Sequence, residues 1–292
     1  LKEFLSYGPK EVCDARISNL RRIKEINPDV ETVYIKPPAK SAVPDVVKYA
    51  DASFNSEFDT IEALSVEAGK QGKKHKVIIM IELGDLREGV MGEDLMDFYE
   101  SVFELPDIEV TGLGTNLNCV SGVYPSEDKL IQLCLYEQLI EARFERSIPW
   151  LTGGTSIVIP LLMKSQVPDG INHFRVGETL FFGNDLFSED IIPGMHGDLF
   201  KLYAEIIEIN EKPIVPVGYM AENPSGEMVD VHEDDYGKLT YRALIDVGVL
   251  DIAKSDFPIP EDSGLEIIGA SSDMLVLDLG ESKQGYEIGD IV

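Results

Sequence analysis

Residues 77–89 read Val-Ile-Ile-Met-Ile-Glu-Leu-Gly-Asp-Leu-Arg-Glu-Gly and carry the clearest indication of the fold. The stretch opens with five consecutive apolar residues, a pattern typical of a strand that is buried on both faces in a parallel sheet. A polar turn follows at Gly84, and a segment with helical periodicity, Leu95–Glu104, comes next. The stretch therefore predicts one strand–loop–helix unit of an α/β fold.

The same unit recurs along the first two-thirds of the chain. The expected strands are Glu11–Asp14, Thr32–Lys36, Asp51–Asn55, Val77–Leu83, Ile108–Thr115, Trp150–Thr155 and His173–Gly177. A closed parallel barrel needs eight strands, and the chain opens in a helix-like segment, so we expect the first barrel strand to lie upstream of Leu1. An open doubly wound sheet is disfavoured, because no glycine-rich dinucleotide turn opens the chain. Residues 1–202 are thus expected to form a TIM-type (β/α)8 barrel that lacks its first strand.

The pattern changes after residue 202, where short apolar runs are separated by glycine and proline. This arrangement predicts an all-β domain over residues 203–292. Its expected strands are Ala204–Asn210, Val215–Met220, Leu239–Val247, Glu266–Gly269, Met274–Leu279 and Gly285–Val292.

Composition excludes several classes of protein. The chain has 292 residues and a formal net charge of −28, which disfavours nucleic acid or a membrane surface as a partner because both are anionic. Its three cysteines show no metal-type spacing, and neither do its four histidines, so no metal site is expected. An odd and small cysteine count indicates a reducing compartment, and we expect the protein to be cytoplasmic.

In a parallel barrel, functional groups lie where strands end. Arg87 follows one strand, and Asn116 and Cys119 follow the next. Taken alone, an arginine there can be a surface ion-pair partner, and a cysteine can be a small buried apolar residue.

The last two strand ends are rich in glycine. Gly154 and Ser156 follow the sixth expected strand, and Arg175, Gly177 and Glu178 end the seventh. Glycines let backbone N–H groups approach an anion, and a serine adds a hydroxyl donor. An ordinary tight turn is the alternative for either loop alone, but two such loops on adjacent strands favour a phosphate site.

Taken together, these loops resemble the alanine racemase superfamily, and most closely the branch that contains ornithine racemase. The matching segments run in the family's order along almost the whole chain. They are residues 14–20 (DARISNL), 79–89 (IMIELGDLREG), 112–119 (GLGTNLNC), 153–156 (GGTS), 171–178 (INHFRVGE), 212–213 (KP) and 269–273 (GASSD).

The resemblance implies a barrel and a β-domain with pyridoxal 5′-phosphate at the barrel mouth. Arg175 would hydrogen-bond the pyridine nitrogen of the cofactor. The backbone N–H groups of Gly177 and Glu178, together with Ser156 and the turn at Gly154, would hold the phosphate.

The resemblance also implies roles for the other loops. Arg87 would lie near the cofactor's phenolic oxygen and the substrate carboxylate, and Asn116 would pack against the ring. The family's cofactor lysine ends the first barrel strand, so it is expected upstream of Leu1. The tyrosine that alanine racemases use as the second base is absent here, and Cys119, or Asp273 from the other chain of a homodimer, could replace it.

Three hypotheses stay open on the sequence. The first is a racemase that interconverts the L and D forms of an ornithine- or alanine-type amino acid by two-base proton transfer. The second is a pyridoxal phosphate carrier of the single-barrel kind, which the β-domain disfavours. The third is a degenerate paralogue that binds an anion without catalysis, which Thr155 and Val249 favour because relatives carry other residues there.

Overall fold

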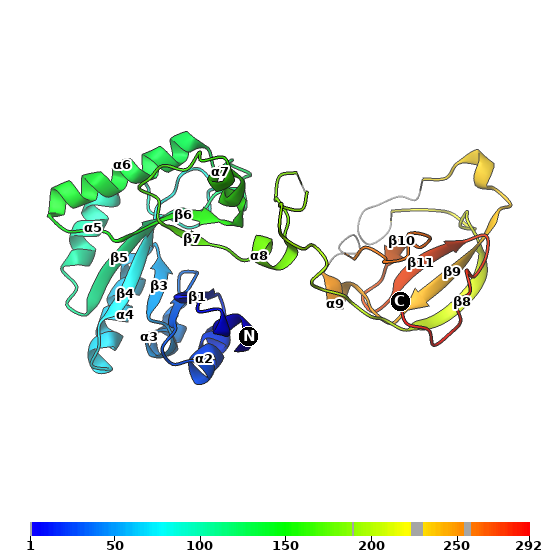
Figure 1. Ribbon diagram of the computed structural model, residues 1–292, viewed down its shortest axis with the longest axis horizontal. Coiled ribbons are helices and arrows are strands. Elements are labelled where there is room, and N and C mark those ends of the chain that lie inside the picture. The colour runs from blue at the N-terminus through cyan, green and yellow to red at the C-terminus, as the bar shows by residue number, and fades with distance from the viewer. Residues whose placement is uncertain (1, 189, 223–229, 254–257) are drawn as a thin grey trace. The chain divides into compact units, whose positions relative to one another are not determined.

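The computed structural model describes residues 2–188, 190–222, 230–253 and 258–292. The chain divides into two compact units, Leu1–Leu199 and Phe200–Val292 (Figure 1). The division falls after residue 199, where the sequence had placed it after residue 202.

The first unit is built on a parallel sheet of seven strands in the order β1-β2-β3-β4-β5-β6-β7. The strands are β1 (Glu11–Asp14), β2 (Glu31–Tyr34), β3 (Ala52–Asn55), β4 (His75–Met80), β5 (Ile108–Gly114), β6 (Trp150–Thr155) and β7 (His173–Arg175). Sequence order equals spatial order, as in a barrel wall, and the seven-strand prediction is confirmed.

Helices connect the strands of the first unit and cover the outer face of the curved sheet (Figure 1). They are α1 (Lys2–Ser6), α2 (Ile17–Ile26), α3 (Val43–Tyr49), α4 (Phe58–Lys70), α5 (Leu95–Phe103), α6 (Glu127–Phe144), α7 (Ile159–Met163) and α8 (Glu178–Phe182), with short 3-10 turns at Lys40–Ala42 and Ser156–Val158. No helix in the described part of the chain is both long enough and apolar enough to cross a membrane.

Two apolar clusters lie on the two faces of the sheet. The larger one lies between sheet and helices and includes Val77, Ile79 and Ile81. The smaller one includes Phe54 and Ile78 and fills the inside of the curve. Alternate residues of β4 thus enter different clusters, which explains the unbroken apolar run that predicted this strand.

Helix α3 was missed by the sequence analysis. It spans only seven residues and contains three valines, which are weak helix formers, and Pro44 lies in its first turn. Proline is tolerated there because the first N–H groups of a helix have no intrahelical acceptor. Val43, Val46 and Val47 are buried, so packing rather than propensity stabilises the helix.

The two edge strands of the sheet approach each other through side chains. No backbone pairing joins β1 to β7 among the described residues. However, the ring Nε2 of His173 lies 2.9 Å from Oε2 of Glu11. The same imidazole stacks on the indole of Trp150, with ring centroids 5.1 Å apart. The sheet is therefore curved enough for its edges to touch, which makes it a nearly closed barrel.

A buried histidine makes the stability of this unit depend on pH. Burial lowers the pKa of His75 to about 4, and its Nε2 lies 2.8 Å from the Ser53 hydroxyl. The unfolded chain therefore binds a proton at a higher pH than the folded chain does. The stability that comes from keeping His75 neutral is lost as pH falls from the pKa of the unfolded state, about 6.5, towards 4. We expect the free energy of unfolding to drop by about 2 kcal/mol more in the wild type than in His75→Gln between about pH 7 and pH 5.

Urea unfolding at the two pH values measures this difference. His196→Gln is the control, because His196 is exposed. An equal pH dependence in the wild type and His75→Gln would contradict the assignment.

The second unit contains a four-stranded antiparallel sheet in the order β10-β11-β9-β8. The elements are β8 (Ile206–Pro213), the 3-10 turn Glu233–Asp235, β9 (Leu239–Ile245), α9 (Val249–Ile252), β10 (Glu266–Ala270) and β11 (Leu275–Gly280). One face of this sheet carries its own apolar cluster, which includes Ile206, Ala243 and Leu277. The predicted β-domain is therefore present with fewer strands than expected.

Two expected strands of this unit were wrong. Residues 215–220 form no strand, because Pro216 cannot donate to a ladder and Val217 and Tyr219 are almost fully exposed. Residues 285–292 also form no named strand. Their pairing is limited to a bridge between Ile291 and Glu205 and a few backbone hydrogen bonds.

Candidate active site

The loops after β4 and β5 meet, and their contact brings together two of the residues singled out in the sequence. Nη1 of Arg87 donates to Sγ of Cys119 over 2.8 Å. The guanidinium also donates to Glu88, and this hydrogen bond raises the pKa of Arg87. Cys119 is exposed, so its sulfur lies beside a positive charge and remains accessible from solvent.

A carboxylate that the sequence analysis did not select organises the loop that carries Cys119. Asp85 is buried and accepts hydrogen bonds from the backbone N–H groups of Cys119 (2.9 Å), Val120 (3.1 Å) and Ser121 (3.2 Å), and from Nδ2 of Asn116 (3.2 Å). Burial alone would raise the pKa of Asp85, but these donors outweigh it and lower the pKa. Asp85 is therefore an anion held by the backbone of a neighbouring loop.

The sequence held one indication of this role. Asp85 stands at a strand end, two residues before Arg87, in the stretch that predicted the fold. Its partners lie 31 to 36 positions further along the chain, so they could be found only in the structure.

Arg175, at the end of β7, points its guanidinium into the inside of the barrel. Nη2 donates to the carbonyl oxygen of Thr115 over 2.8 Å and to Oδ1 of Asn116 over 3.4 Å. The guanidinium also lies over the ring of Phe54, 4.9 Å from its centroid. Burial lowers the pKa of Arg175 to about 10, so the group stays charged at neutral pH. Its Nε is buried with no hydrogen-bond partner, which leaves a donor available for a bound molecule.

The loops after β6 and β7 are joined by the Ser156 hydroxyl. It accepts hydrogen bonds from the N–H groups of Gly177 (3.1 Å) and Thr179 (3.3 Å). Gly154 adopts a φ of 124°, which requires glycine, and a Cβ at Gly177 would meet no atom within 4 Å. Glu178 opens α8, so its N–H has no acceptor within the helix.

Asp273 belongs to the second unit. It lies in the turn between β10 and β11 of the second unit, is exposed, and accepts a hydrogen bond from the Ser272 hydroxyl. The structure thus brings together Arg87, Cys119, Asn116 and Arg175 in the first unit.

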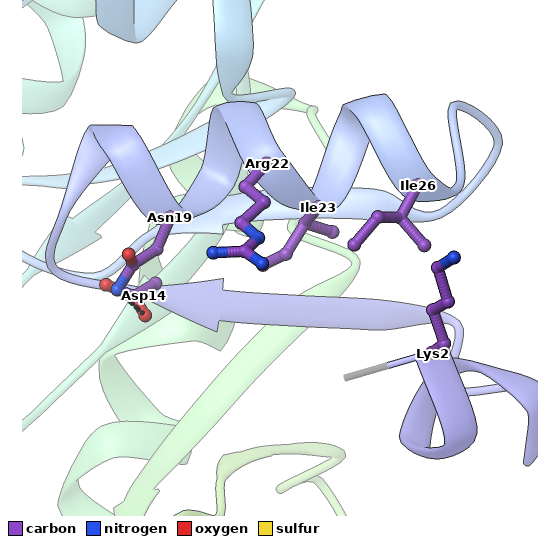
Figure 2. A pocket seen from close by; sticks show the side chains of 6 residues that line it. All are labelled: Lys2, Asp14, Asn19, Arg22, Ile23 and Ile26. Carbon is purple, nitrogen blue, oxygen red and sulfur yellow. Dashed lines mark hydrogen bonds between the residues drawn. The ribbon is translucent and has the colours of Figure 1, made fainter.

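A cavity of about 540 Å³ lies elsewhere in the first unit, beside β1 and α2, and Figure 2 shows its lining. The lining residues are Lys2, Asp14, Asn19, Arg22, Ile23 and Ile26. The Asp14 carboxylate is already engaged by the N–H of Arg16 and by Nδ2 of Asn19. The strand-end loops rather than this cavity therefore hold the candidate site.

Chemically, the strand-end loops suit an anionic molecule that can also accept a hydrogen bond deeper in the barrel. Ser156 has accepted two N–H groups and keeps its own proton to donate. Arg175 supplies an unpaired donor deeper in the barrel. Among the described residues, no three His, Cys, Asp or Glu side chains lie close enough to hold a metal ion.

Comparison with known proteins agrees with this arrangement. Residues 1–185 match the family described as alanine racemase, N-terminal domain. The whole chain is 39% identical to an ornithine racemase of Acetoanaerobium sticklandii and covers 81% of that protein. Over 95% of the chain, the identity to a lysine racemase of Thermotoga maritima is 30%, and the match covers 76% of that protein.

The fold of the chain also resembles that of a solved alanine racemase over both units. An alanine racemase of Clostridium difficile 630 superposes on 99% of the chain and 74% of its own length, with a TM-score of 0.69 and 16% sequence identity. The family match covers well over half of the chain, and the identities to two curated relatives reach 30% or more over most of their lengths. The chain belongs to the alanine racemase family.

Proposed function

We propose that the protein is a pyridoxal-phosphate-dependent racemase that interconverts the L and D forms of an amino acid with a cationic side chain. The main support is the 39% identity, over the whole chain, to an ornithine racemase. The other relative is named a lysine racemase, and lysine, like ornithine, has a cationic side chain. Both names therefore favour a cationic substrate over alanine. Both matches include the second unit, which a single-barrel carrier would lack.

The residues present fit the cofactor. The unpaired Nε of Arg175 can donate to a pyridine nitrogen, and a nitrogen that accepts from a charged guanidinium stays unprotonated. Ser156 and the N–H of Glu178 can bind a phosphate beside the turn at Gly154, with the backbone of Gly177 lining that site. Arg87 can bind the substrate carboxylate, and Asn116, held by Asp85, can pack against the ring.

The reaction moves protons without net transfer of electrons. When bound, pyridoxal phosphate acidifies the Cα–H bond of an amino acid by delocalising the electron pair that the departing proton leaves. A base on one face must then take this proton, and an acid on the other face must deliver one. We assign Sγ of Cys119 to one face, with Arg87 holding positive charge beside the sulfur, and a lysine to the other.

The complete site requires parts that this proposal takes from the family. We place the cofactor lysine upstream of Leu1, as the resemblance to the family implies. We also propose a homodimer in which the partner's Asp273 reaches the barrel mouth, as an alternative to Cys119 for the second base. The location proposed for this enzyme is the cytoplasm.

The direct test uses the full-length protein with added pyridoxal phosphate and L-ornithine, with D-ornithine followed by chiral chromatography. We expect the D form to accumulate until the two enantiomers are equal, and L-lysine to be converted more slowly. No conversion of ornithine, lysine or alanine by a protein that binds the cofactor would reject the racemase. It would instead favour a cofactor-binding paralogue, a role that Val249 suggests because alanine racemases carry a tyrosine there.

Replacement of Cys119 by serine tests the second base. A serine hydroxyl is a much weaker acid than a thiol, so we expect α-proton exchange from one enantiomer to slow by about a hundredfold or more. Exchange from the other enantiomer should change less, since the lysine serves it. Proton exchange into deuterated water, followed by NMR for each enantiomer, measures both rates. Cys134→Ser is the matched control, and equal full rates in Cys119→Ser would exclude the thiol.

A further inference from the structure

Glu88 binds the guanidinium of Arg87 along one edge. Its Oε1 accepts a hydrogen bond from Nη2 of Arg87 over 2.6 Å, and its Oε2 accepts one from Nε. The remaining nitrogen, Nη1, donates to Sγ of Cys119. Glu88 therefore holds two of the three guanidinium nitrogens, and the third contacts the thiol.

The backbone beside Glu88 is fixed to the end of β4. The N–H of Glu82 donates to the carbonyl oxygen of Val90 over 3.0 Å. Gly89 lies so close to this strand end that a Cβ there would overlap the backbone of Glu82. The Glu88 side chain is only 14% exposed, whereas that of Arg87 is 34% exposed. Glu88 is therefore the anchored member of the pair, and Arg87 is the member that extends towards solvent.

The negative charge of Glu88 also lies near a second arginine. Burial lowers the pKa of Arg175, and the charge of Glu88 acts on that pKa in the opposite direction. Such an effect weakens with distance and with exposure to solvent, so the carboxylate faces the site rather than the bulk water. Glu88 is thus a counter-ion shared by Arg87 and Arg175.

The contact with Glu88 leaves donors of Arg87 available for another anion. A guanidinium has five N–H groups, one on Nε and two on each terminal nitrogen. Glu88 and Cys119 accept from three of them, so one N–H on Nη1 and one on Nη2 have no partner among the described residues. Arginine commonly binds a carboxylate through two N–H groups. These two N–H groups suit the α-carboxylate of an amino acid, and they lie beside the thiol.

From these contacts we propose that Glu88 is a positioning residue, which fixes the Arg87 guanidinium so that the substrate carboxylate is bound beside Cys119. This inference rests on the proposed function and adds to it the residue that orients the carboxylate site. The charge of Glu88 alone would act in the opposite direction, because a carboxylate beside Arg87 reduces the attraction of that arginine for a second carboxylate. The sign of the effect on binding therefore separates positioning from charge.

Replacement of Glu88 by glutamine tests the proposal. Glutamine keeps the size of the side chain but offers one acceptor oxygen instead of two. Calorimetric titration of the full-length protein, loaded with pyridoxal phosphate, measures the dissociation constants of L-ornithine and of 1,4-diaminobutane, which is ornithine without its carboxylate. We expect Glu88→Gln to weaken the binding of L-ornithine by about tenfold and to change that of 1,4-diaminobutane by less than about twofold.

Glu67→Gln is the matched control. The Glu67 side chain is 17% exposed and forms an ion pair with Lys70 in α4, so the substitution removes the same charge at a similar exposure. We expect this variant to bind both ligands like the wild type.

A second comparison asks whether Glu88 acts through Arg87. In Arg87→Met, which lacks the guanidinium, the added substitution Glu88→Gln should not weaken ornithine binding further. A general structural role in the loop would instead give the same loss with and without Arg87, and the same loss for both ligands.

The proposal is overturned by ornithine binding that is unchanged or tighter in Glu88→Gln. It is also overturned by an equal loss for both ligands, or by an equal loss in the Arg87→Met background. If the wild type racemises ornithine and Glu88→Gln binds it normally, only the role of Glu88 is rejected. If the wild type binds ornithine without racemising it, the proposed function is rejected, and the comparison of the two ligands still decides the role of Glu88. A wild type that does not bind ornithine overturns both.

Discussion

Substitution of Arg175 by methionine is expected to weaken the binding of pyridoxal phosphate by about a hundredfold and to change the free energy of unfolding of the cofactor-free protein by no more than about 1 kcal/mol. The two effects have separate causes. A hydrogen bond from a charged donor contributes about 1.5–3 kcal/mol, and the variant loses the Nε donor that has no partner within the chain. A buried charge costs free energy to desolvate, and methionine removes that cost while filling similar space beside Phe54. Methionine also removes the hydrogen bonds from Nη2 to Thr115 and Asn116, so the gain and the loss in stability largely offset each other.

Two measurements separate these effects. Titration of the cofactor-free protein with pyridoxal phosphate gives the dissociation constant, and urea unfolding gives the stability. Arg175→Lys keeps the charge but not the planar donor set, so its binding should also be impaired. Arg21→Met removes an exposed arginine and should change neither quantity. Wild-type affinity in Arg175→Met would show that the guanidinium does not contact the cofactor.

Substitution of Asp85 by alanine is expected to destabilise the protein by about 3 kcal/mol and to lower kcat/KM for racemisation by about a hundredfold. The carboxylate holds the N–H groups of Cys119, Val120 and Ser121 together with the Asn116 amide. Without it, these donors lose their common acceptor, and water can replace it only partly. The loop that carries Cys119 then samples positions from which the sulfur does not reach the substrate.

The control leaves the carboxylate intact. Ser121→Ala removes one hydrogen bond, from the Ser121 hydroxyl to the carbonyl oxygen of Asp85, and should cost about 1 kcal/mol with little change in kcat/KM. Limited proteolysis between residues 117 and 123 should be faster in Asp85→Ala than in either Ser121→Ala or the wild type. If the loop of Asp85→Ala resisted proteolysis as well as the wild type and kcat/KM were unchanged, the carboxylate would not position the loop that carries Cys119.

The strands of the first unit could be predicted because burial on both faces leaves a clear pattern. In β4, residues facing the helices and residues facing the barrel interior are all apolar, so the run is unbroken. Helix α3 gave no such pattern, since Pro44 and three valines have low helix propensity and only tertiary packing stabilises it.

In the second unit the pattern was misleading. Val215, Val217 and Tyr219 alternate with other residues as in a half-buried strand, yet only Val215 of the three is buried. Alternation shows that one face of a segment could be buried and does not show that a neighbouring strand is available to pair with it.

The candidate site was predictable to the level of loops. Strand ends of a parallel sheet share one edge, so Arg87, Cys119, Asn116 and Arg175 could be expected near one another. Their connections were not predictable, because Asp85 reaches its partners through backbone N–H groups, which are the same in every residue but proline. The assignment of individual roles, including those of Asp273 and Glu178, stays a prediction.

The contact between Glu11 and His173 has a consequence for the edges of the sheet. The neighbouring strands of the first unit are joined by backbone ladders from β1 to β7. Among the described residues, the two edges themselves meet through one carboxylate and one imidazole, which leaves backbone N–H and C=O groups of both edge strands available for pairing. The strand that we propose upstream of Leu1 would pair with these groups. Its insertion would separate Glu11 from His173, because neighbouring strands lie about 4.8 Å apart.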